Sequence, residues 1–165
     1  MAKFSHFDEQ GASRMVDVGG KPMTERFASA SAVVAMKTET LRRIRDRSLE
    51  KGDVLAVSRL AGIMAAKRTS DLIPLCHPLP IDSVEIQFDF PDEQHVGIRS
   101  RVHVTAKTGV EMEALVAAST AALTIYDMCK SIDRGMTIAQ VRLEEKSGGK
   151  SGHFIREDAD SEPNN

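Results

Sequence analysis

The chain has few aromatic residues and almost no cysteine, and both shortages limit its function. Aromatic residues make up 4% of its 165 residues and Trp is absent, which argues against a platform on which nucleic-acid bases stack. The net charge of −2 lacks the basic excess of a general polyanion binder. The two cysteines, Cys76 and Cys129, show no CxxC or zinc-type spacing. We therefore expect no nucleic-acid partner and no structural metal, as in a reduced cytosolic protein.

Long apolar runs are missing as well. No stretch approaches the roughly 20 residues of a membrane span, and the N-terminus lacks the basic-then-apolar pattern of a signal sequence. We therefore expect a cytoplasmic protein without a membrane partner. An apolar content of 41% is enough for one core. The composition predicts a flexible arm over 1–20, a single α+β domain over 21–146, and a Gly/Ser-rich loop with an acidic tail over 147–165 that is disordered at its end.

The periodicity of apolar residues predicts four strands and three helices. The strands are expected at 27–36, 84–90, 96–106 and 138–145. The helices are expected from 38 to a stop at Gly52, over 53–71, and from a capping box at 108–111 to about Gly135. This order is the ferredoxin-like split βαβ plan with an extra helix, in which a four-stranded antiparallel sheet packs on helices.

The last helix carries no charge over 114–126 and is apolar on every face. Such a helix is buried on more than one side. One sheet covers only one side, so we expect a subunit interface to cover another and the protein to be a homo-oligomer. The alternative is a helix sandwiched within a single chain.

The proline-rich segment after the second helix has the features of a loop that lines a binding site. His77 and Cys76 lie between Pro74, Pro78 and Pro80, and each proline disfavours helix at the residue before it. We expect a stiff, extended loop here. Lys67 and Arg68 precede it, and they either cap the second helix or form an anion site.

Several other charged residues allow both a structural and a chemical interpretation. Asp127 and Lys130 share a helix face at i, i+3; they form either a surface ion pair or an acid–base pair whose pKa values burial tunes. Lys51 either follows a helix C-terminus or belongs to a site. Glu111 is explained by its place in the predicted capping box, whereas no structural role explains Glu113.

The segment 146–151 resembles a Walker motif, but Glu144 stands where that motif needs Gly, so we reject it. The Gly-spaced lysines Lys146 and Lys150 can still bind phosphate through their charge and nearby backbone N–H groups. Together the candidates comprise five cations and three proton carriers: Lys51, Lys67, Arg68, Lys130 and Lys146, with His77, Asp127 and Glu113. They fit a polyphosphorylated small substrate undergoing proton transfer. No metal site or cofactor is required, although Mg²⁺ commonly accompanies triphosphate and pyrophosphate.

Long motifs then match a known family. They are Met15–Val18, Lys51–Asp53, Ala65–Thr69, Asp71–Pro78, Lys107–Ala114, Ala121–Lys130 and Lys146–Gly152. In these segments, and over about residues 11–153, the sequence resembles the cyclic pyranopterin monophosphate synthase family, the molybdenum cofactor biosynthesis protein C (MoaC) family.

The resemblance implies a phosphorus–oxygen lyase. Its substrate would be 3′,8-cyclo-7,8-dihydroguanosine 5′-triphosphate, and its products cyclic pyranopterin monophosphate and pyrophosphate. General acids and bases would rebuild the purine-derived ring as a pterin, and cations would stabilise the leaving pyrophosphate while a sugar hydroxyl attacks the α-phosphorus. The family also implies a homohexamer, a trimer of dimers, with sites at subunit interfaces.

The resemblance assigns roles by position. The implied catalytic residues are Asp127, Lys51, Lys130 and His77. The implied substrate-binding residues are Leu75, Cys76, His77, Glu111, Met112 and Glu113, with Arg26, Lys67 and Lys146 on the phosphates.

Two other functions compete. One is a non-catalytic nucleotide-sensing ferredoxin-like oligomer, which would need the cations but has no use for Asp127 beside Lys130 and His77. The other is a Cys–His hydrolase using Cys76, which is disfavoured because adjacent residues on an extended strand point to opposite faces.

Overall fold

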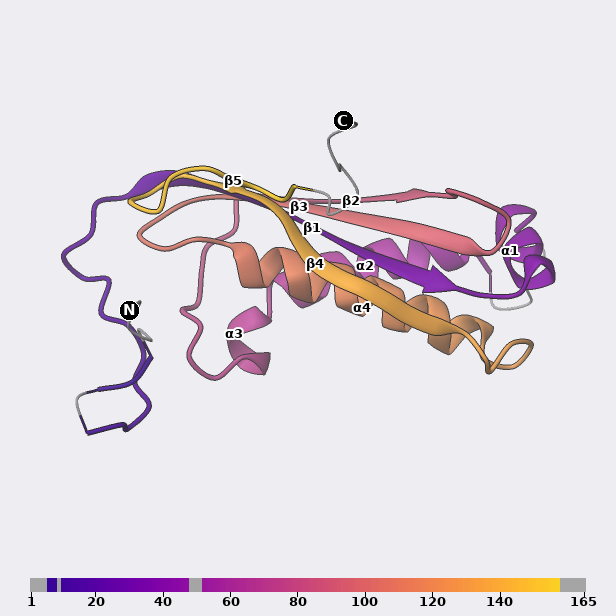
Figure 1. Cartoon of the computed structure of the whole chain (residues 1–165), viewed down its shortest axis with the longest axis horizontal. Coiled ribbons are helices and arrows are strands. Elements are labelled where there is room, and N and C mark those ends of the chain that lie inside the picture. The colour runs from indigo at the N-terminus through magenta and orange to yellow at the C-terminus, as the bar shows by residue number, and fades with distance from the viewer. Residues whose placement is uncertain (1–5, 9, 48–51, 158–165) are drawn as a thin grey trace, which may run out of the picture.

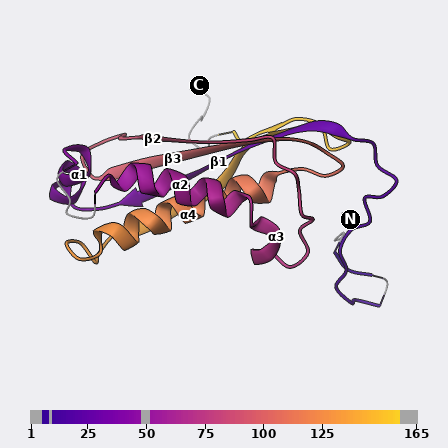
Figure 2. The same cartoon turned by 180° about the vertical axis from the view of Figure 1, so that it is seen from behind.

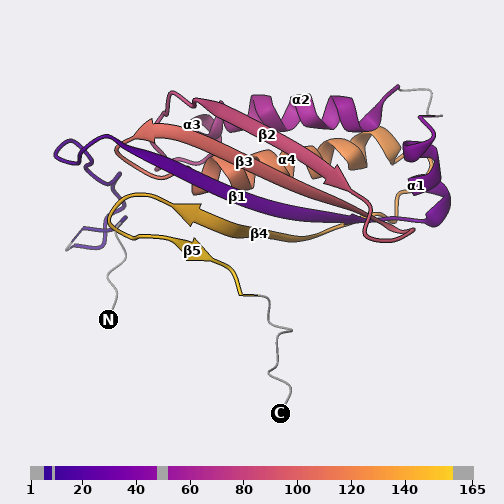
Figure 3. The same cartoon turned by 90° about the horizontal axis from the view of Figure 1, so that it is seen from above.

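The computed structural model describes residues 6–8, 10–47 and 52–157. Five strands form one antiparallel sheet in the order β2-β3-β1-β4-β5 (Figure 3). The strands are β1 Thr24–Ala35, β2 Ser83–Asp89, β3 His95–Ala106, β4 Thr137–Ser147 and β5 Phe154–Ile155. The first four strands have the order of the split βαβ plan. The expected four-stranded sheet gains one short edge strand, β5.

The two long helices cover one face of this sheet, and α1 (Thr38–Arg45) lies at one end of it (Figures 1 and 2). The other helices are α2 Val54–Ala66, α3 Thr69–Leu72 and α4 Glu111–Cys129. The two long helices, α2 and α4, lie side by side, with α4 under the central strands and α2 nearer β2. Within the described residues, no helix is long and apolar enough to cross a membrane.

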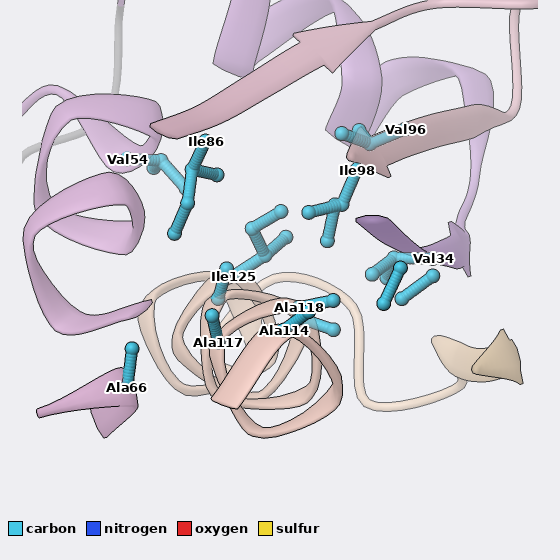
Figure 4. Packing of buried hydrophobic residues seen from close by; sticks show 14 of the residues in the cluster. Val34, Val54, Ala66, Ile86, Val96, Ile98, Ala114, Ala117, Ala118 and Ile125 are labelled. Carbon is cyan, nitrogen blue, oxygen red and sulfur yellow. The ribbon is translucent and has the colours of Figure 1, made fainter. Parts of the chain in front are cut away.

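The core lies between the sheet and the two long helices. Small side chains on the inner face of β1, at Ala28, Ala30 and Ala32, are fully buried and let α4 approach closely. Ser100 of β3 adds a buried polar link, because its Oγ donates to the carbonyl of Ala114 on α4 at 2.7 Å. Figure 4 shows the apolar side chains that fill the space above α4, among them Val34, Ile98, Ile125, Ile86 and Val54.

Gly62 sets the spacing between α2 and its neighbours. A Cβ there would lie 2.2 Å from Cδ1 of Ile86 and 2.8 Å from the backbone oxygen of Ala117. The Ile86 side chain can rotate, but the backbone of α4 cannot move without disturbing the core. Gly62→Ala is therefore expected to lower the free energy of unfolding by about 1–3 kcal/mol, despite the roughly 1 kcal/mol by which Ala favours a helix.

Urea denaturation measures this loss. The matched control is Gly20→Ala, since no atom lies within 4 Å of a Cβ built at Gly20. A stabilised Gly62→Ala variant would contradict the close helix contact.

The strands predicted at 84–90 and 96–106 are confirmed as β2 and β3, which pair as a hairpin, but the predictions for all three helices need correction. The predicted capping box is wrong: α4 begins at Glu111 with Val110 as N-cap and no side-chain cap. The helix also ends at Cys129 rather than near Gly135. The chain leaves the helical path after Cys129 because the buried Asp133 carboxylate accepts hydrogen bonds from the backbone nitrogens of Lys37 (2.9 Å) and Gly135 (3.1 Å).

The two earlier helices are shorter than predicted. The helix expected over 53–71 breaks into α2 and α3, where the Thr69 hydroxyl donates to the carbonyl of Ala66 at 3.0 Å. The first helix ends at Arg45, and Arg47 follows with a left-handed φ of 51°. Leu49, which was expected on this helix, lies outside the described residues.

Most of the apolar surface of α4 is covered within the single chain. From 114 to 126 only Leu123 is exposed, because the sheet and α2 cover the rest. The alternative, in which the helix is sandwiched within one chain, thus accounts for most of the apolar residues on α4. An apolar stripe remains on the outside of the helical layer, at Val57, Leu60 and Met64 of α2 and Leu123 of α4, each 44–59% exposed.

Candidate active site

A cavity of about 340 Å³ lies at the N-terminal end of α4. Three parts of the chain line it: the arm before β1, the loop after α3, and the first turn of α4. Its lining includes Val16, Val18, Lys21, Leu75, Cys76, His77, Glu111, Met112 and Glu113. The six residues Leu75–His77 and Glu111–Glu113, which the resemblance assigns to substrate binding, therefore meet in one place.

Local hydrogen bonds hold these segments together. The Cys76 nitrogen donates to the carbonyl of Ile73 at 3.1 Å, so the expected extended loop begins with a turn and is irregular from Cys76 onward. The Lys107 Nζ donates to the carbonyl of Gly19 at 2.7 Å. This bond ties the arm to the end of β3 and brings Lys21 to the cavity wall.

Glu113 is the most perturbed acid of the cavity. Its side chain is buried, with only 4% of the residue exposed. Burial, helped by the charge of Glu111 and opposed by a backbone hydrogen bond, raises the pKa of Glu113 from 4.5 to about 7. A carboxyl group with this pKa can both donate and accept a proton at neutral pH, which is what general acid–base catalysis requires.

Cys76 is poorly suited to act as a nucleophile. Burial raises the pKa of its thiol above the ordinary value, and the charge of Glu113 raises it further. The reactive thiolate is thus disfavoured. The half-buried His77 lines the same cavity, so the histidine is available to the site without a cysteine partner.

The predicted catalytic pair lies at the other end of α4. Lys130 Nζ donates to Asp127 Oδ1, and the two side chains are 52% and 65% exposed. The 14 residues from Glu113 to Asp127 span about 21 Å of helix at 1.5 Å per residue. Within one chain the pair therefore lacks the burial expected of it and is remote from the cavity.

Lys51 itself lies outside the described residues. Both interpretations of Lys51 therefore stay predictions.

The expected phosphate ligands are spread over the cavity end of the sheet and helices. Lys67 is the exposed C-cap of α2, as the structural interpretation predicted. Arg26 lines a second cavity of about 590 Å³ beside the first. Lys146 donates to Ser151 Oγ, and Ser151 lines that second cavity.

Sequence reasoning missed two lysines in these cavities, Lys21 and Lys107, and considered Lys150 only as one of the Gly-spaced lysines of 146–151. Lys21 lines both cavities, and Lys107 and Lys150 line the second. Lys107 lies within a matched motif, which could have drawn attention to it. Lys21 lies outside every motif, and only its position after Gly19 and Gly20 marks it.

A third cavity, of about 610 Å³, opens on the outer face of the sheet. Charges of both signs line it, including Arg101, which lies 3.9 Å from Glu85 across the β2–β3 pair. Of the predicted site residues only Arg26 lines it, whereas six line the first cavity, so we place the candidate site at the first cavity and the second one beside it.

Comparison with known proteins shows the family to which the chain belongs. The MoaC family matches residues 15–149. The chain is 61% identical to the cyclic pyranopterin monophosphate synthase of Heliobacterium modesticaldum, over 96% of this chain and 100% of the relative. It is 60% identical to that of Magnetococcus marinus, over 98% and 100%. Cyclic pyranopterin monophosphate synthase 3 of Mycobacterium tuberculosis is 55% identical, over 96% and 90%. Because these matches cover nearly the whole chain, the protein belongs to the MoaC family.

Proposed function

We propose that the chain is a cyclic pyranopterin monophosphate synthase of molybdenum cofactor biosynthesis. It converts 3′,8-cyclo-7,8-dihydroguanosine 5′-triphosphate to cyclic pyranopterin monophosphate and pyrophosphate. The observation that supports this best is the buried Glu113 carboxyl, whose raised pKa of about 7 suits proton transfer in a cavity that adjoins a cationic one. We place the reaction in the cytoplasm, with Mg²⁺ accompanying the phosphates.

The two parts of the reaction need different groups. Opening and rebuilding the purine-derived ring moves protons to and from nitrogen and oxygen atoms, and Glu113 and His77 line the cavity where this would occur. Forming the cyclic phosphate builds charge on the departing pyrophosphate, which nearby cations stabilise. Asp127, Lys130 and Lys51 are proposed to complete the proton transfers.

A complete site then requires a second copy of the chain. Asp127 and Lys130 are about 21 Å along α4 from Glu113, too far to act on one small substrate. The apolar stripe of Val57, Leu60, Met64 and Leu123 supports contact between two helical layers. If a two-fold axis crosses this stripe perpendicular to α4, the two α4 helices run antiparallel. The Asp127 end of each copy then meets the Glu113 end of the other.

This arrangement deepens the expectation of a homo-oligomer. Each dimer would hold two sites, and three dimers would give the hexamer that the resemblance implies. The stripe is modest in size, which fits a contact that is extended by site residues from both copies.

Turnover tests the function directly. The purified protein is given the cyclised dihydro-GTP, and both pyrophosphate and the pterin product are followed. We expect wild-type turnover and a loss of roughly 10²–10⁴-fold in Lys51→Ala, if the lysine transfers a proton. The control is Arg99→Ala, because Arg99 is exposed on the outer face of β3 and should leave turnover unchanged.

The test also separates the enzyme from its competitor. Tight binding of the substrate by the wild type without pyrophosphate release would reject the synthase and favour a nucleotide sensor. A Lys51→Ala variant with full turnover would remove that lysine from the chemistry.

A further inference from the structure

Two buried acidic residues lie near opposite ends of α4. Among the described residues, Glu113 and Asp133 are the only acidic ones that are buried, with 4% and 2% exposed. Glu113 belongs to the cavity end, whereas Asp133 follows the end that carries Asp127 and Lys130. Burying an ionised carboxylate is costly unless it is paired or hydrogen-bonded. The partners of Asp133 therefore indicate what its burial achieves.

Three hydrogen bonds hold the Asp133 carboxylate. Its Oδ2 accepts from the backbone nitrogen of Lys37 at 2.9 Å and from Thr40 Oγ1 at 3.2 Å. Its Oδ1 accepts from the backbone nitrogen of Gly135 at 3.1 Å. The bond from Lys37 is the main cause that keeps the pKa of Asp133 below its ordinary value, against the opposing effect of burial. The group is therefore ionised at neutral pH, and both of its oxygens are engaged.

These bonds make Asp133 a distant cap of α1. Lys37 is the N-cap residue of that helix, and its own side chain makes no capping bond. The Asp133 Oδ2 binds both this residue and Thr40 in the first turn, and its charge suits the positive end of the helix dipole. The start of α1 is thereby joined to the segment that follows α4.

A tight turn connects this anchor to the end of α4. The Asp133 nitrogen donates to the carbonyl of Cys129 at 3.1 Å. Lys130 is the C-cap of α4, and its nitrogen donates to the carbonyl of Tyr126 at 2.8 Å. The Tyr126 hydroxyl donates in turn to the carbonyl of Arg134 at 3.2 Å. The backbone around Lys130 is thus tied to the turn after the helix, and Asp133 ties that turn to α1.

The exposed ion pair depends on this backbone for its direction. The side chains of Asp127 and Lys130 are 65% and 52% exposed, so packing within the chain does not fix them. Their positions follow from the last turn of α4. Without the anchor that turn could shift, and a displacement of about 1 Å at a reacting group can lower a rate by about 10²-fold.

We propose that Asp133 is a positioning residue, which holds the Asp127–Lys130 end of α4 in the direction in which it meets the Glu113 end of a second copy. The inference rests on the proposed function. In this arrangement Asp133 touches no substrate and transfers no proton. It acts through the backbone of the turn after Lys130, which it fixes to the start of α1.

The kinetics of Asp133→Asn test the assignment. Asn has nearly the size of Asp, but its single oxygen cannot accept hydrogen bonds on both sides. We expect kcat to fall about 10- to 100-fold with little change in KM, because the substrate still binds while the pair is misplaced. The control for a general loss of stability is Val102→Ala, which leaves a cavity in the core and should keep its kcat. An Asp133→Asn protein with the wild-type kcat, or an equal loss in Val102→Ala, would overturn the proposal.

Mixed oligomers show at which end of the site Asp133 acts. Asp133→Asn chains mixed equally with Glu113→Gln chains should recover about a quarter of wild-type turnover, since about one site in four combines two intact ends. Mixed with Asp127→Asn chains they should recover nothing, because both changes damage the same end. Recovery in the second mixture, or none in the first after confirmed exchange of chains, would contradict the proposed role.

Amide hydrogen exchange separates this inference from the function itself. The amides of Lys37 and Lys130 should exchange about tenfold faster in Asp133→Asn, whether or not the protein turns over substrate. Unchanged exchange at Lys130 would reject the anchor and leave the synthase intact. A wild type without turnover, together with faster exchange in the variant, would reject the synthase and leave the anchor.

A milder variant decides the matter if Asp133→Asn does not fold. Thr40→Val keeps the volume of the side chain and removes one of the three bonds to the carboxylate. We expect a severalfold lower kcat and faster exchange at Lys130, in the same direction as for Asp133→Asn. A folded Thr40→Val protein in which both quantities equal those of the wild type would overturn the proposal.

Discussion

Mixing Asp127→Asn chains with Glu113→Gln chains is expected to restore about a quarter of wild-type turnover. Each variant alone should be nearly inactive, since the loss of a general acid or base lowers rates by about 10²–10⁴-fold. The two residues lie at opposite ends of α4, about 21 Å apart along the helix. If each site takes one end from each copy, a mixed oligomer contains sites in which both ends are intact.

Random association fixes the size of the recovery. In an equal mixture, half of the chains keep Asp127 and the other half keep Glu113. A site takes one of these residues from each of two chains, so about one site in four has both. The chains are unfolded and refolded together, or are produced together in one cell, so that copies exchange. Turnover of the mixture is then compared with that of each variant alone.

A second mixture is the matched control. Asp127 and Lys130 lie on the same end of α4 and contact each other. Chains carrying Asp127→Asn and Lys130→Ala therefore cannot complement, because every site would keep one defect at that end. Recovery in this control, or none in the first mixture after confirmed exchange of chains, would contradict a site shared between copies.

Much of the fold could be predicted from the sequence because its signals are local. The alternation of Val84, Ile86 and Phe88 faces the helices as expected, and β2 and β3 pair along their length. The order of elements then leaves few ways to pair β1, and the split βαβ plan places it between β3 and β4.

Helix ends were harder to predict because distant contacts decide them. The buried Asp133 ends the turn after α4 by binding the backbone at Lys37, which is 96 residues away in the sequence. The Thr108 pattern has the form of a capping box, but the helix starts three residues later, at Glu111. Neither outcome can be found from spacing alone.

The candidate site, too, could be predicted only in part, because distant segments of the chain form it. The motifs around Cys76 and Glu113 are each visible in the sequence, and the structure brings them into one cavity. The second cavity is not visible in the sequence, because Lys21 and Lys107 come from distant segments and no pattern links them to the Gly-spaced Lys150. The separation of Asp127 from Glu113 could have been predicted, since both lie on one continuous helix.

Replacing Glu113 by Gln is expected to stabilise the protein at high pH while it reduces activity. The pKa of Glu113 is about 7 in the folded chain and 4.5 without the fold. The fold thus favours the protonated carboxyl group. As the pH rises from 4.5, the pKa in the unfolded chain, to about 7, the pKa in the folded chain, the free energy of unfolding therefore falls. The penalty is about 1 kcal/mol at pH 5 and about 3 kcal/mol at pH 8. Gln, which stays neutral, avoids it.

Urea denaturation at pH 5 and pH 8 measures the difference. Glu113→Gln should gain little at pH 5 and up to about 3 kcal/mol at pH 8. Glu93→Gln, at an exposed position before β3, should change stability equally little at both pH values. A Glu113→Gln variant less stable than the wild type at pH 8 would mean that the ionised carboxylate is itself stabilised by a neighbour.

The shared site gives this experiment a second use. Lys130 of a second copy would approach Glu113, favour its ionised form and so reduce the gain from Glu113→Gln. Removing that cation with Lys130→Ala should then enlarge the gain, and the difference between the two backgrounds measures the coupling of the residues. Equal gains in both backgrounds would place Lys130 away from Glu113 in every copy. A buried acid that lowers stability and is needed for turnover is the expected signature of a catalytic group.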